Sequence, residues 1–158
     1  MVSIFADFGF SGGRAMELIS FAIFSVLLVV SLVHLGWAFG MAWPAKQREM
    51  LVPAVVGLPK GTPMPPAALT VLVAFAILGL GVVALWGAGL FALPAFAGLK
   101  GWALLGVAAI FGLRGVATYL PFGPFKVSVE PFRTLNWRYF SPLCLLLSAG
   151  YMTIFLSL

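Results

Sequence analysis

Residues 18–43 read LISFAIFSVLLVVSLVHLGWAFGMAW and contain no lysine, arginine, aspartate or glutamate. An α-helix rises 1.5 Å per residue, so about 20 apolar residues cross the roughly 30 Å hydrocarbon core of a bilayer. A secretory signal peptide has a shorter apolar core, of about 7–15 residues, behind a basic segment, and no basic segment precedes this stretch. The stretch therefore predicts a retained membrane-spanning helix.

The rest of the 158-residue chain has the same character, with 63% hydrophobic and 8% charged residues. Soluble domains carry roughly 25% charged residues, so the composition excludes an ordinary soluble enzyme and a disordered chain. The net charge of +5 comes from scattered basic residues that form no phosphate-tracking stripe, which argues against nucleic acid as a partner. One cysteine and one histidine exclude an intrachain disulfide and a bis-histidine haem. The sequence indicates no metal and no cofactor.

Three more spans follow from gaps in the charge pattern and from proline positions. Residues 61–99 are free of formal charge but too long for one span, and Pro94 divides them. Pro121 ends the next span, and Pro142 suits the first turn of the last one. The apolar runs are continuous and not alternating, which favours helices over a barrel. The predicted fold is an all-α polytopic membrane protein, with four transmembrane helices in one antiparallel bundle (18–158) after an N-terminal extension (1–17). The predicted spans are residues 18–43, 67–91, 98–120 and 141–158, joined by long connections at 44–66 and 121–140.

The basic residues predict the orientation of this bundle. Both long connections lie on one side of the membrane, and the termini lie on the other. The long connections carry Lys46, Arg48, Lys60, Lys126, Arg133 and Arg138, whereas the opposite side carries Arg14 and Lys100. Cytoplasmic loops have an excess of lysine and arginine. We therefore expect a bacterial inner-membrane protein with cytoplasmic long connections and both termini outside.

Two ionisable side chains fall within predicted spans. His34 lies about 13 Å from the end of the first span at Trp43, and Arg114 about 9 Å from the end of the third, at 1.5 Å per residue. Such residues are functional candidates because a lipid-facing charge is costly. His34 alternatively ties helices together as a neutral hydrogen-bonded group, and Arg114 alternatively extends to the headgroups. If Arg114 stays inside, its acceptor is a helix-end carbonyl, Asn136, Glu130 or a bound anion.

The topology places these residues in the same half of the bundle as the start of the fourth span. This predicts one cytoplasmic-side pocket lined by His34, Trp37, Arg114, Asn136, Tyr139, Ser141 and Cys144. A buried, inert thiol is the simpler interpretation of Cys144. Gly36 and Gly40 form a Gly-x-x-x-Gly pattern that predicts close helix packing.

Three segments resemble a known family. The segments are HLGWAFGMAWP (34–44), LRGVATY (113–119) and NWRYFSPLCLLL (136–147). They are similar to small bacterial integral membrane proteins catalogued as domain of unknown function 3995, over residues 18 to 158. The resemblance implies four membrane helices and no assigned activity. The family pattern often has an aspartate where this chain has Asn136, which would remove a charge partner of Arg114.

These features favour a non-catalytic accessory or assembly subunit, packed beside a larger membrane complex or a second copy of the chain. The alternative is a bundle that binds a lipid or small anion in the cytoplasmic-side pocket, with membrane lipids as partners. A third hypothesis is a membrane enzyme that uses His34 as acid and base, but no second titrating residue supports it. The sequence therefore predicts no catalytic residues.

The orientation can be tested with reporters fused after Leu158. We expect a reporter that is active only outside the cytoplasm to be active there, because six basic residues flank the opposite side and two flank this one. Activity of a cytoplasm-only reporter at the same position would reverse the predicted orientation.

Overall fold

A computed structural model describes residues 12–121, 123, 125 and 127–158, and this part of the chain is helical, with no strand. Four of its segments are long and apolar enough to cross a membrane: Gly12–Ala38, Ala67–Gly87, Pro94–Val116 and Phe132–Leu156. The predicted all-α class and the count of four spans are confirmed, and the chain is an integral membrane protein. The elements are α1 (Gly12–Ala38), η1 (Arg48–Met50), α2 (Leu51–Val55), α3 (Ala67–Gly87), η2 (Pro94–Leu99), α4 (Lys100–Val116), α5 (Phe132–Leu135), η3 (Asn136–Phe140) and α6 (Ser141–Leu156).

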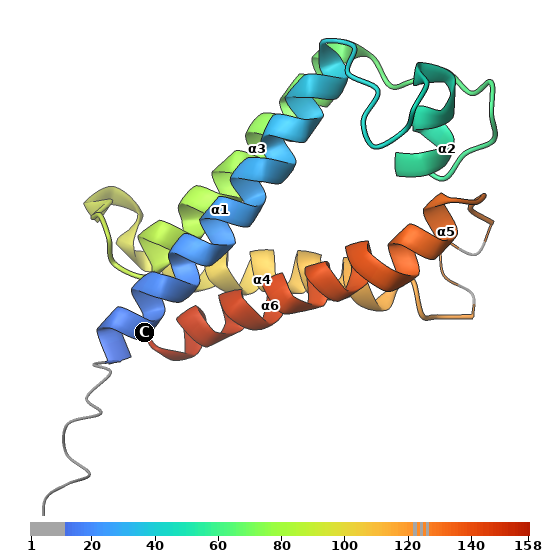
Figure 1. Cartoon of the computed structure of the whole chain (residues 1–158). Coiled ribbons are helices and arrows are strands. Elements are labelled where there is room, and N and C mark those ends of the chain that lie inside the picture. The colour runs from blue at the N-terminus through green and yellow to red at the C-terminus, as the bar shows by residue number, and fades with distance from the viewer. Residues whose placement is uncertain (1–11, 122, 124, 126) are drawn as a thin grey trace, which may run out of the picture.

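The four long helices form two antiparallel hairpins that diverge from one end. Helix α1 packs along α3, and α4 packs along α6. The two hairpins meet near the C-terminus and open into a V, with α2 and α5 at its wide end (Figure 1). The antiparallel directions match the predicted bundle, but contacts between the hairpins are concentrated at one end of the helices. We call the α1–α3 hairpin the first arm and the α4–α6 hairpin the second arm.

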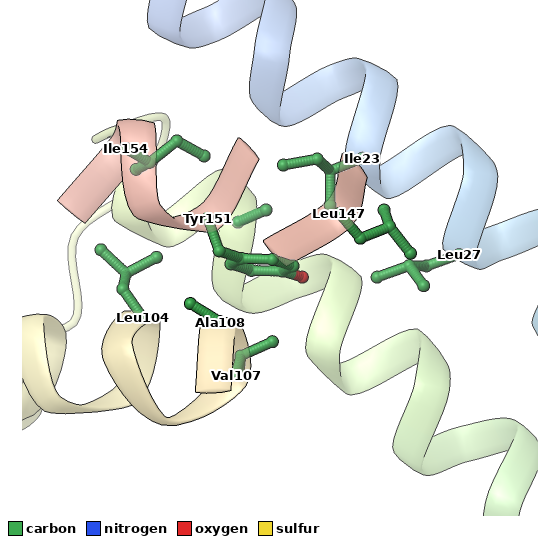
Figure 2. Close-up of a cluster of buried hydrophobic side chains, with 9 residues drawn as sticks. Ile23, Leu27, Leu104, Val107, Ala108, Leu147, Tyr151 and Ile154 are labelled. Carbon is green, nitrogen blue, oxygen red and sulfur yellow. The ribbon is translucent and has the colours of Figure 1, made fainter. Parts of the chain in front are cut away.

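The arms meet in a cluster of buried apolar side chains that all four long helices supply. Tyr151 of α6 lies at its centre and is fully buried (Figure 2). Its hydroxyl donates a hydrogen bond to the Leu80 carbonyl of α3, at 2.6 Å. A buried phenol needs such an acceptor, and this one lies on the other arm. The cluster comprises Ile23, Leu27, Ala84, Leu104, Val107, Ala108, Leu147, Tyr151 and Ile154.

Each arm has its own hydrogen bond between its two helices. Ser31 of α1 donates to the Ala74 carbonyl of α3 at 2.8 Å. Ser148 of α6 donates to the Ala108 carbonyl of α4 at 2.7 Å. Small polar side chains commonly join helices in this way inside membranes, where packing replaces the hydrophobic drive between helices.

The wide end of the V is closed by contacts between the two long connections. The amide of Val129 donates to the Gly57 carbonyl at 3.0 Å. Phe132, at the start of α5, is buried here, and a Cβ on Gly57 would lie 2.5 Å from its ring. The arms are therefore joined twice, by helix packing at the narrow end and by loop packing at the wide end.

Helix α1 is displaced along the sequence relative to the predicted span 18–43. It begins within the predicted extension, at Gly12, while residues 1–11 lie outside the described part. It ends at Ala38 because Gly40 has a left-handed φ of 99°. The amides of Gly40 and Met41 donate to the carbonyls of Trp37 and Gly36, at 3.1 and 2.8 Å. This pair of bonds is a Schellman motif, which terminates helices at glycine.

The helix-packing interpretation of Gly36 and Gly40 is therefore wrong. Gly40 lies beyond the helix, so the two glycines do not share a helical face. The space over Gly36 is occupied by the Met41 side chain, which folds back after the turn. Helix α4 instead approaches α6 at Gly115, where a Cβ would lie 2.7 Å from Leu145.

The contact at the wide end can be tested with Gly57→Ala. The left-handed φ of 83° and the crowded Phe132 ring both oppose a Cβ at this position. Gly61 is the matched control, because it has a φ of 92° but no atom lies within 4 Å of the place that its Cβ would take. We expect Gly61→Ala to lower the free energy of unfolding by about 1–2 kcal/mol from backbone strain alone. Gly57→Ala should cost about 1–3 kcal/mol more from overpacking. Equal losses in an SDS titration would show that the junction contributes nothing.

Candidate functional site

A π-helical turn at the start of the fourth span shapes the site. Residues 136–140 form this turn, within one continuous helical segment from Phe132 to Leu156. An α-helical pattern would pair the Arg138 carbonyl with the amide of residue 142, and Pro142 has no amide. The Ser141 amide instead donates to the Asn136 carbonyl, five residues back. The predicted start of this span at residue 141 coincides with the start of α6, but helical structure continues upstream through the π turn to Phe132, because the wider turn accommodates the proline inside the segment.

The π turn leaves one carbonyl without a hydrogen-bond donor from its own helix. A tyrosine hydroxyl from the end of α4 supplies that donor. The Trp137 carbonyl lies four residues before Ser141, whose amide is already used, and five before Pro142. The Tyr119 hydroxyl donates to this carbonyl at 3.1 Å, and the Tyr119 and Trp137 rings pack edge to face. The end of α4 is thereby fixed to the start of α6.

The same turn brings Asn136 and Ser141 onto one face. In an α-helix, residues five apart point about 140° away from each other, at 3.6 residues per turn. Here both are buried and both bond Thr118, which follows α4. The Asn136 amide donates to the Thr118 hydroxyl at 2.8 Å, and the Ser141 and Thr118 hydroxyls are 2.7 Å apart. Three polar side chains thus form one hydrogen-bonded cluster between the helices of the second arm.

Arg114 is held against this cluster. Its Nη2 donates to the Asn136 side-chain oxygen at 2.8 Å, and its Nη1 donates to the Thr118 hydroxyl at 3.4 Å. Its guanidinium also lies over the Phe125 ring, 4.1 Å from the centroid. Among the described residues the only ion pair joins Lys60 and Glu49, so the Arg114 charge has no carboxylate partner there. Of the acceptors predicted for Arg114, the structure selects Asn136.

A pocket of about 640 Å³ lies directly beside this cluster. Thr118, Phe125 and Asn136 line it, and all three also contact Arg114. Arg114 does not itself line the pocket, and in this sense it lies behind the pocket wall. The remaining lining residues are Leu120, Pro121, Ser128, Glu130, Arg133, Thr134, Trp137 and Arg138.

The lining carries charge of both signs. Arg133 and Arg138 are exposed cations, and Nη2 of Arg133 donates to the Ser128 carbonyl at 2.7 Å. Glu130 is an exposed anion, and its Oε2 accepts a hydrogen bond from the Thr134 amide at 3.2 Å. A guanidinium has five N–H donors, so both arginines retain donors for a bound group. Lys126, a further basic residue of this connection, lies outside the described residues.

The structure does not bring all seven predicted site residues together. His34 and Trp37 lie on α1, near the far end of the first arm, while Arg114 lies near the end of α4 in the second arm, so the V separates them (Figure 1). Nδ1 of His34 donates to the Val30 carbonyl of its own helix at 2.8 Å, and its ring packs on Trp37. This hydrogen bond stays within α1, whereas the prediction had His34 bonded to a neighbouring helix.

The remaining predicted residues belong to the second arm, but only some reach the cluster. Asn136 and Ser141 do, whereas Tyr139 is 62% exposed and does not line the pocket. Cys144 is a half-buried free thiol. Thr118 was missed, although it lies four residues after Arg114 and so shares its helical face. Phe125 was also missed. No sequence spacing indicates its contact with Arg114, because that contact depends on the path of the loop between α4 and α5.

The described residues contain no group of three His, Cys, Asp or Glu side chains that could hold a metal ion. The charged groups that line the pocket are Arg133, Arg138 and Glu130. The two guanidinium groups can bind a phosphate or carboxylate.

Comparison with family models finds a match over most of the chain. Residues 27–151 match a family described as a protein of unknown function (DUF3995). Comparison with curated proteins and with solved structures finds no match.

Thr118→Val tests the hydrogen-bonded cluster. The substitution keeps the shape of the side chain but removes the acceptor of the buried Asn136 amide. Leaving a buried donor unsatisfied costs about 1–3 kcal/mol, so we expect that loss in the free energy of unfolding, measured by SDS titration. Thr153→Val is the matched control, because Thr153 is exposed on α6 and bonds only the Ala149 carbonyl of its own helix. A loss no larger than that of the control would contradict the cluster.

Proposed function

Because the chain belongs to the DUF3995 family, whose description assigns no activity, we propose its function from the geometry of the pocket: it is an integral membrane protein that binds the phosphate of a membrane lipid. The observation that carries the proposal is the pocket beside the Asn136 cluster, which has Arg133 and Arg138 in its lining and Arg114 in contact with three lining residues. Arginine binds phosphate through paired N–H donors in a planar fork, which fixes orientation as well as charge.

The state of Arg114 supports this proposal. Its guanidinium lies within the third span, where an uncompensated charge is costly, yet its hydrogen-bond acceptors are a neutral amide and a hydroxyl. A carboxylate at position 136 would have neutralised it. With Asn136 there, the positive potential of Arg114 extends through the wall into the pocket and adds to that of Arg133 and Arg138.

The depth of the pocket supports a lipid headgroup as the occupant. The pocket lies where the third span ends and the fourth begins. Tyr119, Trp137 and Tyr139 are exposed at this level by 44%, 58% and 62%. Exposed tyrosine and tryptophan side chains favour the headgroup region of a bilayer. The basic residues of the long connections favour a cytoplasmic location for them, and in that orientation the pocket would take lipids of the cytoplasmic leaflet.

An accessory or assembly subunit is the second candidate function, and the V shape favours it. The helices contact each other more within each arm than between the arms, and the arms separate toward the wide end (Figure 1). Large apolar side chains of the long helices, such as Val29, Leu72 and Ile110, are exposed. A larger complex or a second copy of the chain would cover them. Native mass spectrometry of gently extracted protein separates the two functions, since a stoichiometric protein partner indicates the subunit and retained phospholipid indicates the binding protein. An enzyme that uses His34 gains no support, because His34 lies on the other arm from the pocket.

The binding function can be tested with the double variant Arg133→Gln/Arg138→Gln. Charge-assisted hydrogen bonds contribute about 1.5–3 kcal/mol each, and about 1.4 kcal/mol is tenfold in affinity. We therefore expect phospholipid retention to fall at least about tenfold, measured by native mass spectrometry from nanodiscs. Arg14→Gln/Lys46→Gln is the matched control, because it removes the same charge from residues that do not line the pocket.

A second variant separates charge from shape in the same assay. Asn136→Asp is nearly isosteric and gives Arg114 a carboxylate partner, so it should lower retention by neutralising the charge behind the wall. Unchanged retention in both the double variant and Asn136→Asp would exclude the phosphate site.

A further inference from the structure

Resting on the proposed phosphate site, we infer that its ligand is a zwitterionic headgroup carrying a phosphodiester and a primary ammonium, as in an ethanolamine phospholipid. The observation that points to this chemistry is Glu130. Its carboxylate lines the same pocket as the guanidinium groups of Arg133 and Arg138. The pocket therefore presents fixed charges of opposite sign to one occupant.

The Glu130 carboxylate is held in place but is not neutralised by the neighbouring arginines. Its Oε2 accepts the Thr134 amide in the first turn of α5, at 3.2 Å. This amide is one of the helix-terminal donors that have no partner within the helix. In the described part of the chain Glu130 forms no ion pair within 4.0 Å with Arg133 or Arg138. Among the described residues no hydrogen bond or ion pair engages its second oxygen, which we take as the acceptor for a ligand.

A ligand with only negative charge leaves the Glu130 carboxylate of this lining without a partner. Its phosphate would gain from Arg133 and Arg138 but would be repelled by Glu130 in the same pocket. A headgroup that carries an ammonium beside its phosphate matches both signs. The phosphate oxygens accept from the arginines, and the ammonium donates to Glu130.

The carboxylate also distinguishes between kinds of ammonium. A primary ammonium has three N–H donors and can form a direct hydrogen bond with a carboxylate oxygen. A quaternary ammonium has none and gains only the charge attraction. Ethanolamine headgroups are therefore preferred over choline headgroups, and both over a glycerol headgroup, which has the same phosphodiester without positive charge.

The test uses the full chain in nanodiscs that contain equal amounts of ethanolamine, choline and glycerol phospholipids with identical acyl chains. Native mass spectrometry identifies the lipids that stay bound during stepwise removal of the bilayer. We expect ethanolamine lipid to be retained about fivefold over glycerol lipid, which is the upper range for one solvent-exposed ion pair. Choline lipid should lie between them.

Glu130→Gln should remove this preference and leave retention of glycerol lipid unchanged or higher. Glu49→Gln is the matched control, because it makes the same change in charge at an exposed carboxylate that pairs with Lys60 in the other connection. The control should keep the wild-type preference. A change of preference in both variants would mean that net charge, not the pocket, sets selectivity, and would overturn the inference.

A competition experiment with added glycerophosphoethanolamine distinguishes a lipid ligand from a free metabolite that has the same headgroup. Displacement of bound lipid by this soluble compound shows that the headgroup alone is recognised, and failure to displace it shows that the acyl chains contribute. Either result agrees with the inferred headgroup chemistry. Equal retention of ethanolamine and glycerol lipids by the wild-type chain would overturn it while leaving the phosphate site intact. If the Arg133→Gln/Arg138→Gln variant retains both lipids as well as the wild-type chain does, the phosphate site itself is refuted.

Discussion

The missing amide of Pro142 is the constraint on which the second arm depends. A backbone carbonyl that a proline deprives of its helical donor needs another donor where it is shielded from water. The chain meets this need with a π turn before the proline and with the Tyr119 hydroxyl on the Trp137 carbonyl. Because of the turn, Asn136 and Ser141 face the same way and meet Thr118. The anchor for Arg114 therefore exists because a proline lies inside a membrane helix.

That cluster fixes the position of Arg114, and Arg114 in turn makes the potential in the pocket more positive. Hydrogen bonds to Asn136 and Thr118 and the Phe125 ring hold the guanidinium behind the wall. The side chain thus contributes positive potential and rigidity, while Arg133, Arg138 and Glu130 provide the groups that a ligand would touch. Exposed lining residues on a fixed wall suit a ligand that exchanges with the bilayer.

The contacts within each arm differ from the contacts between the arms, and this difference explains the V. Each hairpin is held along its length by helix packing and by one serine–carbonyl bond between its helices. Between the arms, Tyr151 bonds α3 at the narrow end, and Gly57 and Phe132 join the connections at the wide end. Both long connections are consequently part of the fold. Helix α2 illustrates this, since four of its five residues are buried.

Much of the architecture can be predicted from the order of residues along the chain. The charge-free stretches and the prolines predicted four membrane helices, because only a continuous apolar helix satisfies its backbone in lipid. The predicted pocket combined polar residues of the first, third and fourth spans, and in the structure Arg114, Asn136 and Ser141 of the last two meet. The helix ends were less accurate. The glycine at position 40 looked like a packing residue but serves as a helix terminator, which a letter pattern cannot distinguish from a helical small-residue face.

What the sequence by itself determined is the membrane class, the number of helices and the presence of an arginine that needs an acceptor, since these follow from local hydrophobicity and charge. Tertiary structure alone decided which of the predicted site residues meet. His34 and Arg114 both lie toward the same end of their helices, but the arms diverge and separate them, because helix pairing is set by side-chain packing over long sequence distances. The contacts of Arg114 with Asn136 and Phe125 depend on a π turn and on the path of a loop. Neither can be read from the spacing of residues along one helix.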